Sequence, residues 1–126
     1  MDIALWIAAG LLAAVALAAG ISKTFVPKEK LDAHPLSWTS SVSAGFVKTL
    51  GVLELLAAVG LILPAVVDVV PVLVPITAAL WVVLMLGAMV VHGRLGQYKL
   101  IALNVIYLAL AIFIAYGRFG PESFTG

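Results

Sequence analysis

The hydrophobic residues of this chain fall into four long runs, separated by short groups of polar residues, glycines and prolines. The first run covers 3–22 without a charged residue, and the others cover about 47–65, 71–91 and 100–117. Each run is close to the roughly 20 apolar residues that cross a bilayer as a helix. A segment in lipid must also satisfy its own backbone hydrogen bonds, which favours helices. The pattern therefore predicts an all-α, four-transmembrane-helix bundle that forms a single domain over 1–126.

Prolines and glycines mark the expected helix ends. We expect Pro64 to close the second helix, and Pro71 and Pro75 to lie near the start of the third, where proline is best tolerated. His92 and Gly96 form a C-terminal signal for that third helix. The connections after the second and third helices are therefore predicted to be short.

The one long connection, 23–46, has features of a membrane surface. Its segment 27–32 can form one or two interfacial helical turns, and Trp38 is expected to sit at the level of the lipid headgroups. The run before this loop could also be a signal peptide. It has no basic start, however, and its apolar stretch exceeds the core of such a peptide, so we interpret it as a span.

The composition agrees with a membrane protein and excludes several other classes. Of the 126 residues, 64% are hydrophobic and 10% are charged, which fits neither a soluble domain nor a disordered chain. Seven Lys and Arg residues against six Asp and Glu residues give a net charge of +1, which disfavours nucleic acid as a partner. The absence of cysteine excludes thiolate catalysis and Cys-ligated metal centres, and no metal site is expected.

Positive charges predict the orientation. Six Lys or Arg residues occupy or flank the first and third loops, against one in the C-terminal tail. The six are Lys23, Lys28, Lys30, Lys48, Arg94 and Lys99, and the one is Arg118. By the positive-inside rule, the loop 23–46 and the third loop face the cytoplasm and both termini face outward. We therefore expect a multi-pass protein of the plasma (inner) membrane.

Polar residues of all four spans are expected to meet in the cytoplasmic leaflet. Glu54 lies six residues beyond Lys48, roughly 9 Å below the boundary at 1.5 Å per residue. Asn104 lies five residues beyond Lys99, roughly 7 to 8 Å deep on the same side. Lys23 ends the first span and His92 ends the third, at that boundary.

Small and apolar residues at helical spacing place these polar groups on packed faces. The stripes are Gly20, Ala19, Ala16, Ala13 and Ala9 with Lys23; Gly51, Ala58 and Leu61 with Glu54; Ala88 and Met85 with His92; and Tyr107, Leu108 and Ala111 with Asn104. Small residues mark close helix contacts in membranes. We therefore predict a polar cavity inside the bundle, with Lys23, Glu54, His92, Asn104 and Tyr107 as the candidate residues for binding a ligand.

Each candidate also has a purely structural explanation. Lysines at the boundary can extend to the lipid headgroups, which we expect of Lys28, Lys30, Lys48 and Lys99 and which Lys23 could share. His92 and Arg94 can complement the end of their helix, Asn104 can bond a neighbouring helix, and Tyr107 can simply pack. For Asp2, Asp68 and Arg118, on the outer side, we expect ion pairing or solvation.

Glu54 is the strongest functional candidate. A carboxylate inside a bilayer is unfavourable unless it is paired, so such a residue points to function. A protonated Glu54 bonded to a carbonyl, or a Lys–Glu pair that fixes the packing, is the structural alternative. If it is functional, Glu54 is the candidate proton carrier.

Five segments together resemble a known family. They are GISK (20–23), KTLGVLE (48–54), GLILP (60–64), GAMVVH (87–92) and YGRF (116–119). In this order and spacing, the chain resembles the DoxX-like family of small four-helix membrane proteins over nearly its whole length. The resemblance implies that Lys23, Glu54 and His92 are polar positions of the family, and it assigns no catalytic role to them. Relatives include a subunit linked to a thiosulfate:quinone oxidoreductase, a component of membrane antioxidant complexes and an animal chaperone for receptor assembly.

Three functions are compatible with these patterns. The first is binding of a quinone, a lipid or another lipophilic molecule in a redox-associated system, with Lys23, His92, Asn104 and Tyr107 as donors. The chain has no Cys pair. It also lacks a second histidine for a haem in the bundle, because His34 lies in a loop and His92 alone cannot hold one. The electrons would therefore come from a redox partner protein or a bound cofactor. The second is a non-enzymatic assembly factor or accessory subunit. The expected partner protein is a redox protein or a second copy of the chain, which would make a homo-oligomer. The third is a small proton-coupled transporter, disfavoured because the first span lacks a carboxylate. Whether the protein is an enzyme stays open.

Overall fold

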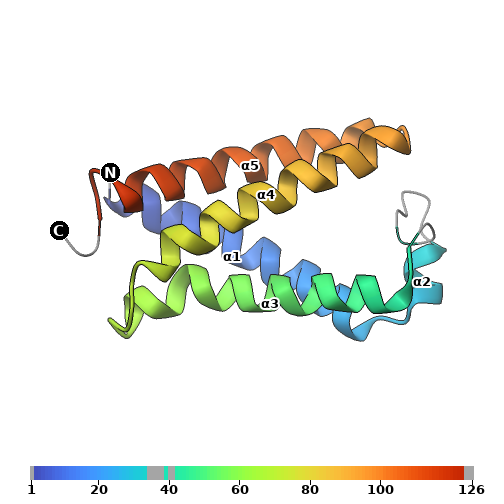
Figure 1. The fold of residues 1–126 in the computed structure, drawn as a ribbon, viewed down its shortest axis with the longest axis horizontal. Helices are drawn as coiled ribbons and strands as arrows, with labels where there is room; N and C mark the ends of the chain where they lie inside the picture. Colours follow the sequence, from blue (N-terminus) through green and yellow to red (C-terminus); the bar gives the residue numbers. More distant parts are fainter. Residues whose placement is uncertain (1, 34–38, 40–41, 124–126) are drawn as a thin grey trace.

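The computed structural model describes residues 2–33, 39 and 42–123, and these residues form helices without strands. The helices are α1 (Asp2–Phe25), α2 (Lys28–Asp32), α3 (Ala44–Val66), α4 (Leu73–Arg94) and α5 (Tyr98–Phe119). All but α2 are long and apolar enough to cross a membrane (Figure 1). The predicted all-α bundle of four spanning helices is confirmed, and the chain is a multi-pass membrane protein.

The helix α3 begins at Ala44, three residues earlier than the predicted start at 47. The reason is an N-cap that the hydrophobic pattern does not reveal. The Ser43 hydroxyl accepts a hydrogen bond from the Phe46 N–H at 3.2 Å, which satisfies one of the open backbone donors of the first turn.

The expectation that Pro64 closes this helix is wrong, because α3 continues to Val66. Proline removes only its own backbone donor, and the ladder resumes beyond it. The Val67 N–H donates to the Leu63 carbonyl at 3.0 Å. The other two prolines lie where they were expected, with Pro71 just before α4 and Pro75 in its first turn.

A glycine in the left-handed region ends α4. Gly96 has a φ of +71°, its N–H donates to the Gly93 carbonyl at 3.3 Å, and the Gln97 N–H donates to the His92 carbonyl at 2.8 Å. This pair of bonds is the Schellman arrangement. It turns the chain into α5 within three residues and brings Gln97 back beside His92.

Replacement of Gly96 by Ala should lower the free energy of unfolding by about 1 kcal/mol, since an L-residue is disfavoured in the left-handed region. Gly93→Ala is the matched control, because a Cβ there would meet only the Ile101 Cδ1 at 3.8 Å, an ordinary contact. SDS titration in mixed micelles measures both variants. Equal stability of the two would contradict the assigned cap.

The helical turns expected at 27–32 are present as α2. Asp32 accepts hydrogen bonds from Lys28 Nζ at 2.8 Å and from Thr39 Oγ1 at 2.6 Å. These two bonds hold the pKa of the Asp32 carboxyl below its usual range. Lys28 therefore pairs within the chain, contrary to the expectation that it extends to headgroups. Trp38 and His34 lie outside the described residues.

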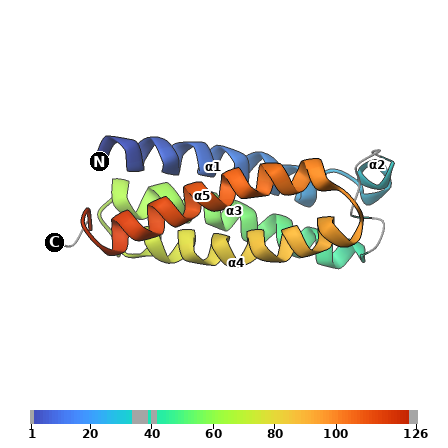
Figure 2. The ribbon, with the colours of Figure 1, turned by 90° about the horizontal axis from the view of Figure 1, so that it is seen from above.

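The four long helices form two pairs. α1 packs along α3, and α4 packs along α5, whereas contacts between the pairs are fewer. The pairs approach one another at the end of the bundle where α1 begins and α5 ends, and they diverge toward the other end (Figure 1). That other end carries α2 and the α4–α5 turn (Figure 2). We call this second end the α2 end.

Close contacts hold the pairs together at the terminal end. A Cβ built on Gly117 of α5 would lie 2.6 Å from the Leu5 side chain of α1. Next to it, Arg118 Nη1 donates to Asp2 Oδ1 at 2.7 Å and its guanidinium lies over the Trp6 ring. The ion pair expected for Arg118 is therefore present, but its side chain is buried rather than solvated.

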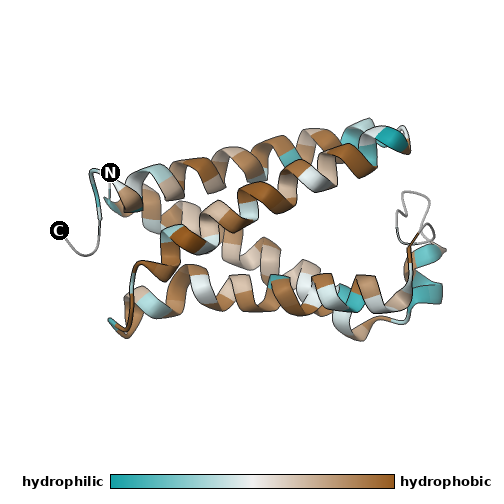
Figure 3. Ribbon diagram, in the orientation of Figure 1, coloured by the Kyte–Doolittle hydropathy of each residue, from teal (hydrophilic) through white to brown (hydrophobic). Residues whose placement is uncertain are grey.

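The surface of the bundle is apolar along the length of the four long helices, and the polar residues gather mainly toward the ends (Figure 3). Leucines, isoleucines and valines on all four long helices are exposed, including Ile7, Leu56, Val83 and Ile106. In a soluble protein such patches are rare, so these side chains contact the lipid bilayer. The core, by contrast, contains many alanines, as expected for closely packed helices.

Candidate functional site

An ion pair between α1 and α3 lies at the centre of the candidate site. Lys23 Nζ is 2.6 Å from Glu54 Oε1, and the two side chains are 19% and 4% exposed. Lys23 is in the last turn of α1, whereas Glu54 is ten residues inside α3. The structure thus adopts the Lys–Glu pair that the sequence left as one of several arrangements.

Two glycines allow α1 and α3 to approach closely enough for this pair. A Cβ on Gly20 would lie 2.9 Å from the Gly51 carbonyl oxygen, and a Cβ on Gly51 would lie 2.8 Å from the Thr24 backbone nitrogen. Any side chain at either position would push the helix backbones apart. The contact lies within one turn of both Lys23 and Glu54, so it sets the distance between them.

His92 faces the same region from the last turn of α4. It is 8% exposed, and its Nδ1 lies 2.8 Å from Gln97 Oε1. An amide oxygen can only accept, so in this arrangement the His92 Nδ1 carries the proton. The Schellman turn at Gly96 places Gln97 there, so the cap also orients the imidazole.

On α5, Asn104 and Tyr107 lie one turn apart. Asn104 is 8% exposed, and its Nδ2 has no hydrogen-bond partner among the described residues. Tyr107 is half-buried and packs against the hydrophobic core. Asn104 was expected to bond a neighbouring helix, and its Nδ2 makes no such bond within the described residues.

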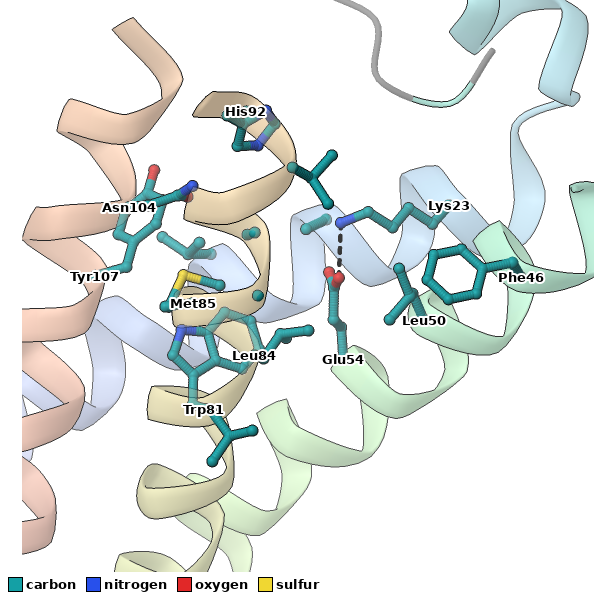
Figure 4. Close-up of a pocket in the computed structure, with 16 residues that line it drawn as sticks. Lys23, Phe46, Leu50, Glu54, Trp81, Leu84, Met85, His92, Asn104 and Tyr107 are labelled. Carbon is teal, nitrogen blue, oxygen red and sulfur yellow. Dashed lines mark hydrogen bonds and ion pairs between the residues drawn. The ribbon is translucent and has the colours of Figure 1, made fainter. Parts of the chain in front are cut away.

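All five candidates line one pocket of about 400 Å³ between the two helix pairs (Figure 4). This volume is in the range of roughly 300–1,000 Å³ that holds small molecules. Lys23 and Glu54 point toward each other on one side, Asn104 and Tyr107 of α5 lie on the other, and His92 lies at the end of α4. The remaining lining is Val15, Ala19, Phe46, Leu50, Trp81, Val83, Leu84, Met85, Gly87, Ala88 and Val91. The structure brings the candidates together, and their role in binding stays a prediction.

Trp81 is a lining residue that the sequence analysis missed. It is 3% exposed, and its indole N–H has no partner among residues 2–33, 39 and 42–123. The sequence carries a signal for it, because Trp81, Met85, Ala88 and His92 follow each other at helical spacing on one face of α4.

The pocket offers unpaired buried groups of both hydrogen-bonding types. Asn104 Nδ2 and Trp81 Nε1 are donors, and Glu54 Oε2 is an acceptor, each without a partner in the described part of the chain. Buried polar atoms are usually bonded, and exceptions indicate a place for a ligand or an ordered water. Within the described residues, no group of three or more His, Asp or Glu could hold a metal ion.

One lysine outside the pocket, Lys48, also has a contact that differs from the expectation based on the sequence. Lys48 was expected to extend to headgroups, but its Nζ donates to the Thr24 carbonyl at 3.1 Å. The α1–α3 contact places that carbonyl, at the end of α1, within reach. Lys48 thus also ties α1 to α3, one turn from Gly51.

Comparison with known proteins gives one match. A sequence model described as the DoxX-like family matches residues 7–114, a stretch that contains all five candidates and Trp81. No curated protein and no solved structure matches the chain significantly.

Proposed function

The chain belongs to the DoxX-like family, and we propose that it binds a quinone or a similar carbonyl-bearing lipophile in the interhelical pocket, as part of a redox-associated membrane system. The observation that carries this proposal is the combination of apolar walls with buried, unpaired donors. A quinone ring needs apolar surface on its faces and a donor at each carbonyl oxygen. Asn104 Nδ2 and Trp81 Nε1 are such donors, buried in the pocket lining.

In this proposal the Lys23–Glu54 pair handles protons. Reduction of a quinone to the quinol takes up two electrons and two protons. The electrons come from a redox partner protein. Glu54 has one oxygen bonded to Lys23 and the other without a partner among the described residues, and it takes up protons and passes them to the ring oxygens. His92, whose Nδ1 is held by Gln97 on the opposite wall, is the second proton carrier, which takes up a proton at Nε2 and passes it on.

The excess of Lys and Arg at the α2 end favours an orientation for the pocket. That end carries Lys28, Lys30, Lys48, Arg94 and Lys99. By the positive-inside rule it faces the cytoplasm, so the pocket lies in the cytoplasmic leaflet of the plasma membrane, both termini face outward, and protons exchange with the cytoplasm.

One observation favours a second function, that of an accessory subunit or assembly factor. α1 presents Gly10, Ala14 and Ala18 on its exposed face, and a Cβ on Gly10 would meet nothing within 4 Å. Small residues permit close approach by another helix. A stoichiometric partner, or a second copy, that crosslinks at this face in native membranes would support this role.

Replacement of Asn104 by Leu is expected to separate binding from stability. The variant removes an unpaired buried donor, so its stability should be unchanged or higher. Loss of the hydrogen bond to the ligand should weaken binding of a decyl-substituted benzoquinone by about tenfold. Mass spectrometry of gently purified protein, together with quinone titration in lipid nanodiscs, measures the retained and the added ligand.

Val105→Leu is the matched control, because Val105 is the neighbouring residue on the lipid-exposed face of α5 and should change neither property. A wild-type protein that retains no lipophile, and whose melting does not respond to the quinone, would contradict the proposed function. So would an Asn104→Leu variant that binds as well as the wild type.

A further inference from the structure

We propose that the ligand enters the pocket sideways from the lipid, through an opening between α3 and α4 whose rim includes Gly87. This inference rests on the proposed binding function and adds the route and the shape of the molecule. It implies a membrane-dissolved ligand with a polar head and an apolar tail, rather than a metabolite taken from water.

The opening results from the way α3 and α4 diverge. Toward the terminal end they touch, since a Cβ on Gly60 of α3 would lie 2.5 Å from the Thr77 hydroxyl of α4. From that contact the two helices separate toward the α2 end (Figure 1). The pocket occupies the space beyond the contact, with α1 behind it (Figure 4).

Four lining residues, two on α3 and two on α4, form the rim. Phe46 and Leu50 are one turn apart on α3, and Val83 and Gly87 are one turn apart on α4; all four line the pocket. Phe46 is 49% exposed and Val83 is 67% exposed, so this wall reaches the outer surface of the bundle. The α5 wall differs, because Asn104 there is 8% exposed. The pocket is therefore open on the α3–α4 side.

Gly87 keeps the opening wide. It is exposed, and a Cβ built on it would meet nothing within 4 Å. The glycines at the helix contacts, Gly51 and Gly60, behave differently, because a Cβ there would collide with the neighbouring helix. Gly87 thus serves no helix contact, and a larger side chain would extend over the mouth of the pocket.

The distribution of polarity gives the direction in which the ligand lies. The rim is made of apolar side chains and a glycine. The polar atoms of Glu54, Trp81 and Asn104 that have no partner in the described part of the chain are all buried behind it. A polar head would therefore reach the interior, and an apolar tail would leave between α3 and α4 into the acyl chains. The tail of the ligand is in an apolar medium both before and after binding, so it gains no hydrophobic free energy at the rim. The rim therefore selects ligands by their shape.

The test compares two probes on three proteins in phosphatidylcholine nanodiscs. The probes are decyl-substituted benzoquinone and the same head without a tail. The proteins are the wild type, Gly87→Leu and the control Gly10→Leu, whose side chain also enters open space but lies on α1 outside the pocket. All three proteins also carry Trp6→Phe and Trp38→Phe, so that Trp81 is the one tryptophan left in the sequence. Quenching of its fluorescence then reports occupancy of the pocket.

We expect Gly87→Leu to weaken binding of the decyl probe by about tenfold or more, as for a bulky side chain competing for a packed contact. Binding of the tail-less head should stay within about twofold of the wild type, and Gly10→Leu should bind both probes normally. If Gly87→Leu melts well below the wild type, Gly87→Ala replaces it. This variant should also weaken binding of the decyl probe more than binding of the tail-less head, but by a smaller factor.

The other outcomes count against one proposal or both. If the wild type binds both probes and Gly87→Leu does so equally well, the lateral route is wrong while the binding function stands. The route is also wrong if Gly87→Leu loses both probes to the same extent, because the pocket itself has then changed. If the wild type binds neither probe, the proposed function fails and the route fails with it.

Discussion

Replacement of Lys23 by Met should lower the free energy of unfolding by about 3–5 kcal/mol, the range found when one member of a buried ion pair is removed. Lys23 Nζ lies 2.6 Å from Glu54 Oε1, and the carboxylate is 4% exposed with its second oxygen unpaired among the described residues. Without the ammonium group, the carboxylate is left in an apolar interior, which is strongly unfavourable. SDS titration in mixed micelles gives the free energy.

The double variant Lys23→Met with Glu54→Gln is the decisive control. It removes both charges while keeping the side-chain shapes, so much of the lost stability should return. Glu54→Gln alone should be destabilised less than Lys23→Met, because Lys23 is 19% exposed and an ammonium at a helix end can extend toward water. If the single and double variants were additive, the pair would contribute nothing to stability, and the geometry assigned to it would be wrong.

Replacement of Gly51 by Leu should lower the free energy of unfolding by at least about 3 kcal/mol, the upper part of the range for overpacking. A Cβ alone would lie 2.8 Å from the Thr24 backbone nitrogen and 2.9 Å from the Lys23 Cβ. Backbone atoms cannot rotate away, so α1 must move as a whole. The move would lengthen the Lys23–Glu54 contact as well, which adds to the loss.

Gly10→Leu serves as the matched control for this variant. The same substitution is made on a spanning helix, but a Cβ on Gly10 would meet nothing within 4 Å. Its stability should be unchanged or slightly higher, because glycine is a poor helix former. If Gly51→Leu proved as stable as Gly10→Leu, α1 and α3 could not be in contact at Gly51.

The helices and their membrane location follow from the sequence because they depend on local properties. Each span is a run of apolar residues of bilayer length, and lipid requires it to be a helix whatever its neighbours. The first and last residues of each helix were predicted less well, because helix caps depend on single residues. Ser43 extended α3 by three residues at its start, and the ladder resumed beyond Pro64.

Most of the polar residues that line the pocket were predictable from the sequence as well. Glu54, His92 and Asn104 each lie on a stripe of small or packed residues, and helical spacing places such stripes toward the bundle interior. Trp81 was missed because a tryptophan in an apolar run looks like ordinary packing, although it shares the face of His92. The pairing of Lys28 and Lys48 inside the chain was also missed, since long lysines reach partners that no local pattern specifies.

The sequence by itself determined four apolar spans and one polar group on the inward face of each, because hydrophobic length and helical period are properties of single segments. Only the tertiary structure decided which groups touch. In it Lys23 bonds Glu54, Asn104 and Trp81 keep donors without a partner among the described residues, and α3 and α4 separate beyond Gly60 and Thr77. These features depend on the angles and distances between helices. Those are set by steric contacts between residues far apart in the chain, at Gly20 with Gly51 and at Gly117 with Leu5, and no single segment encodes them.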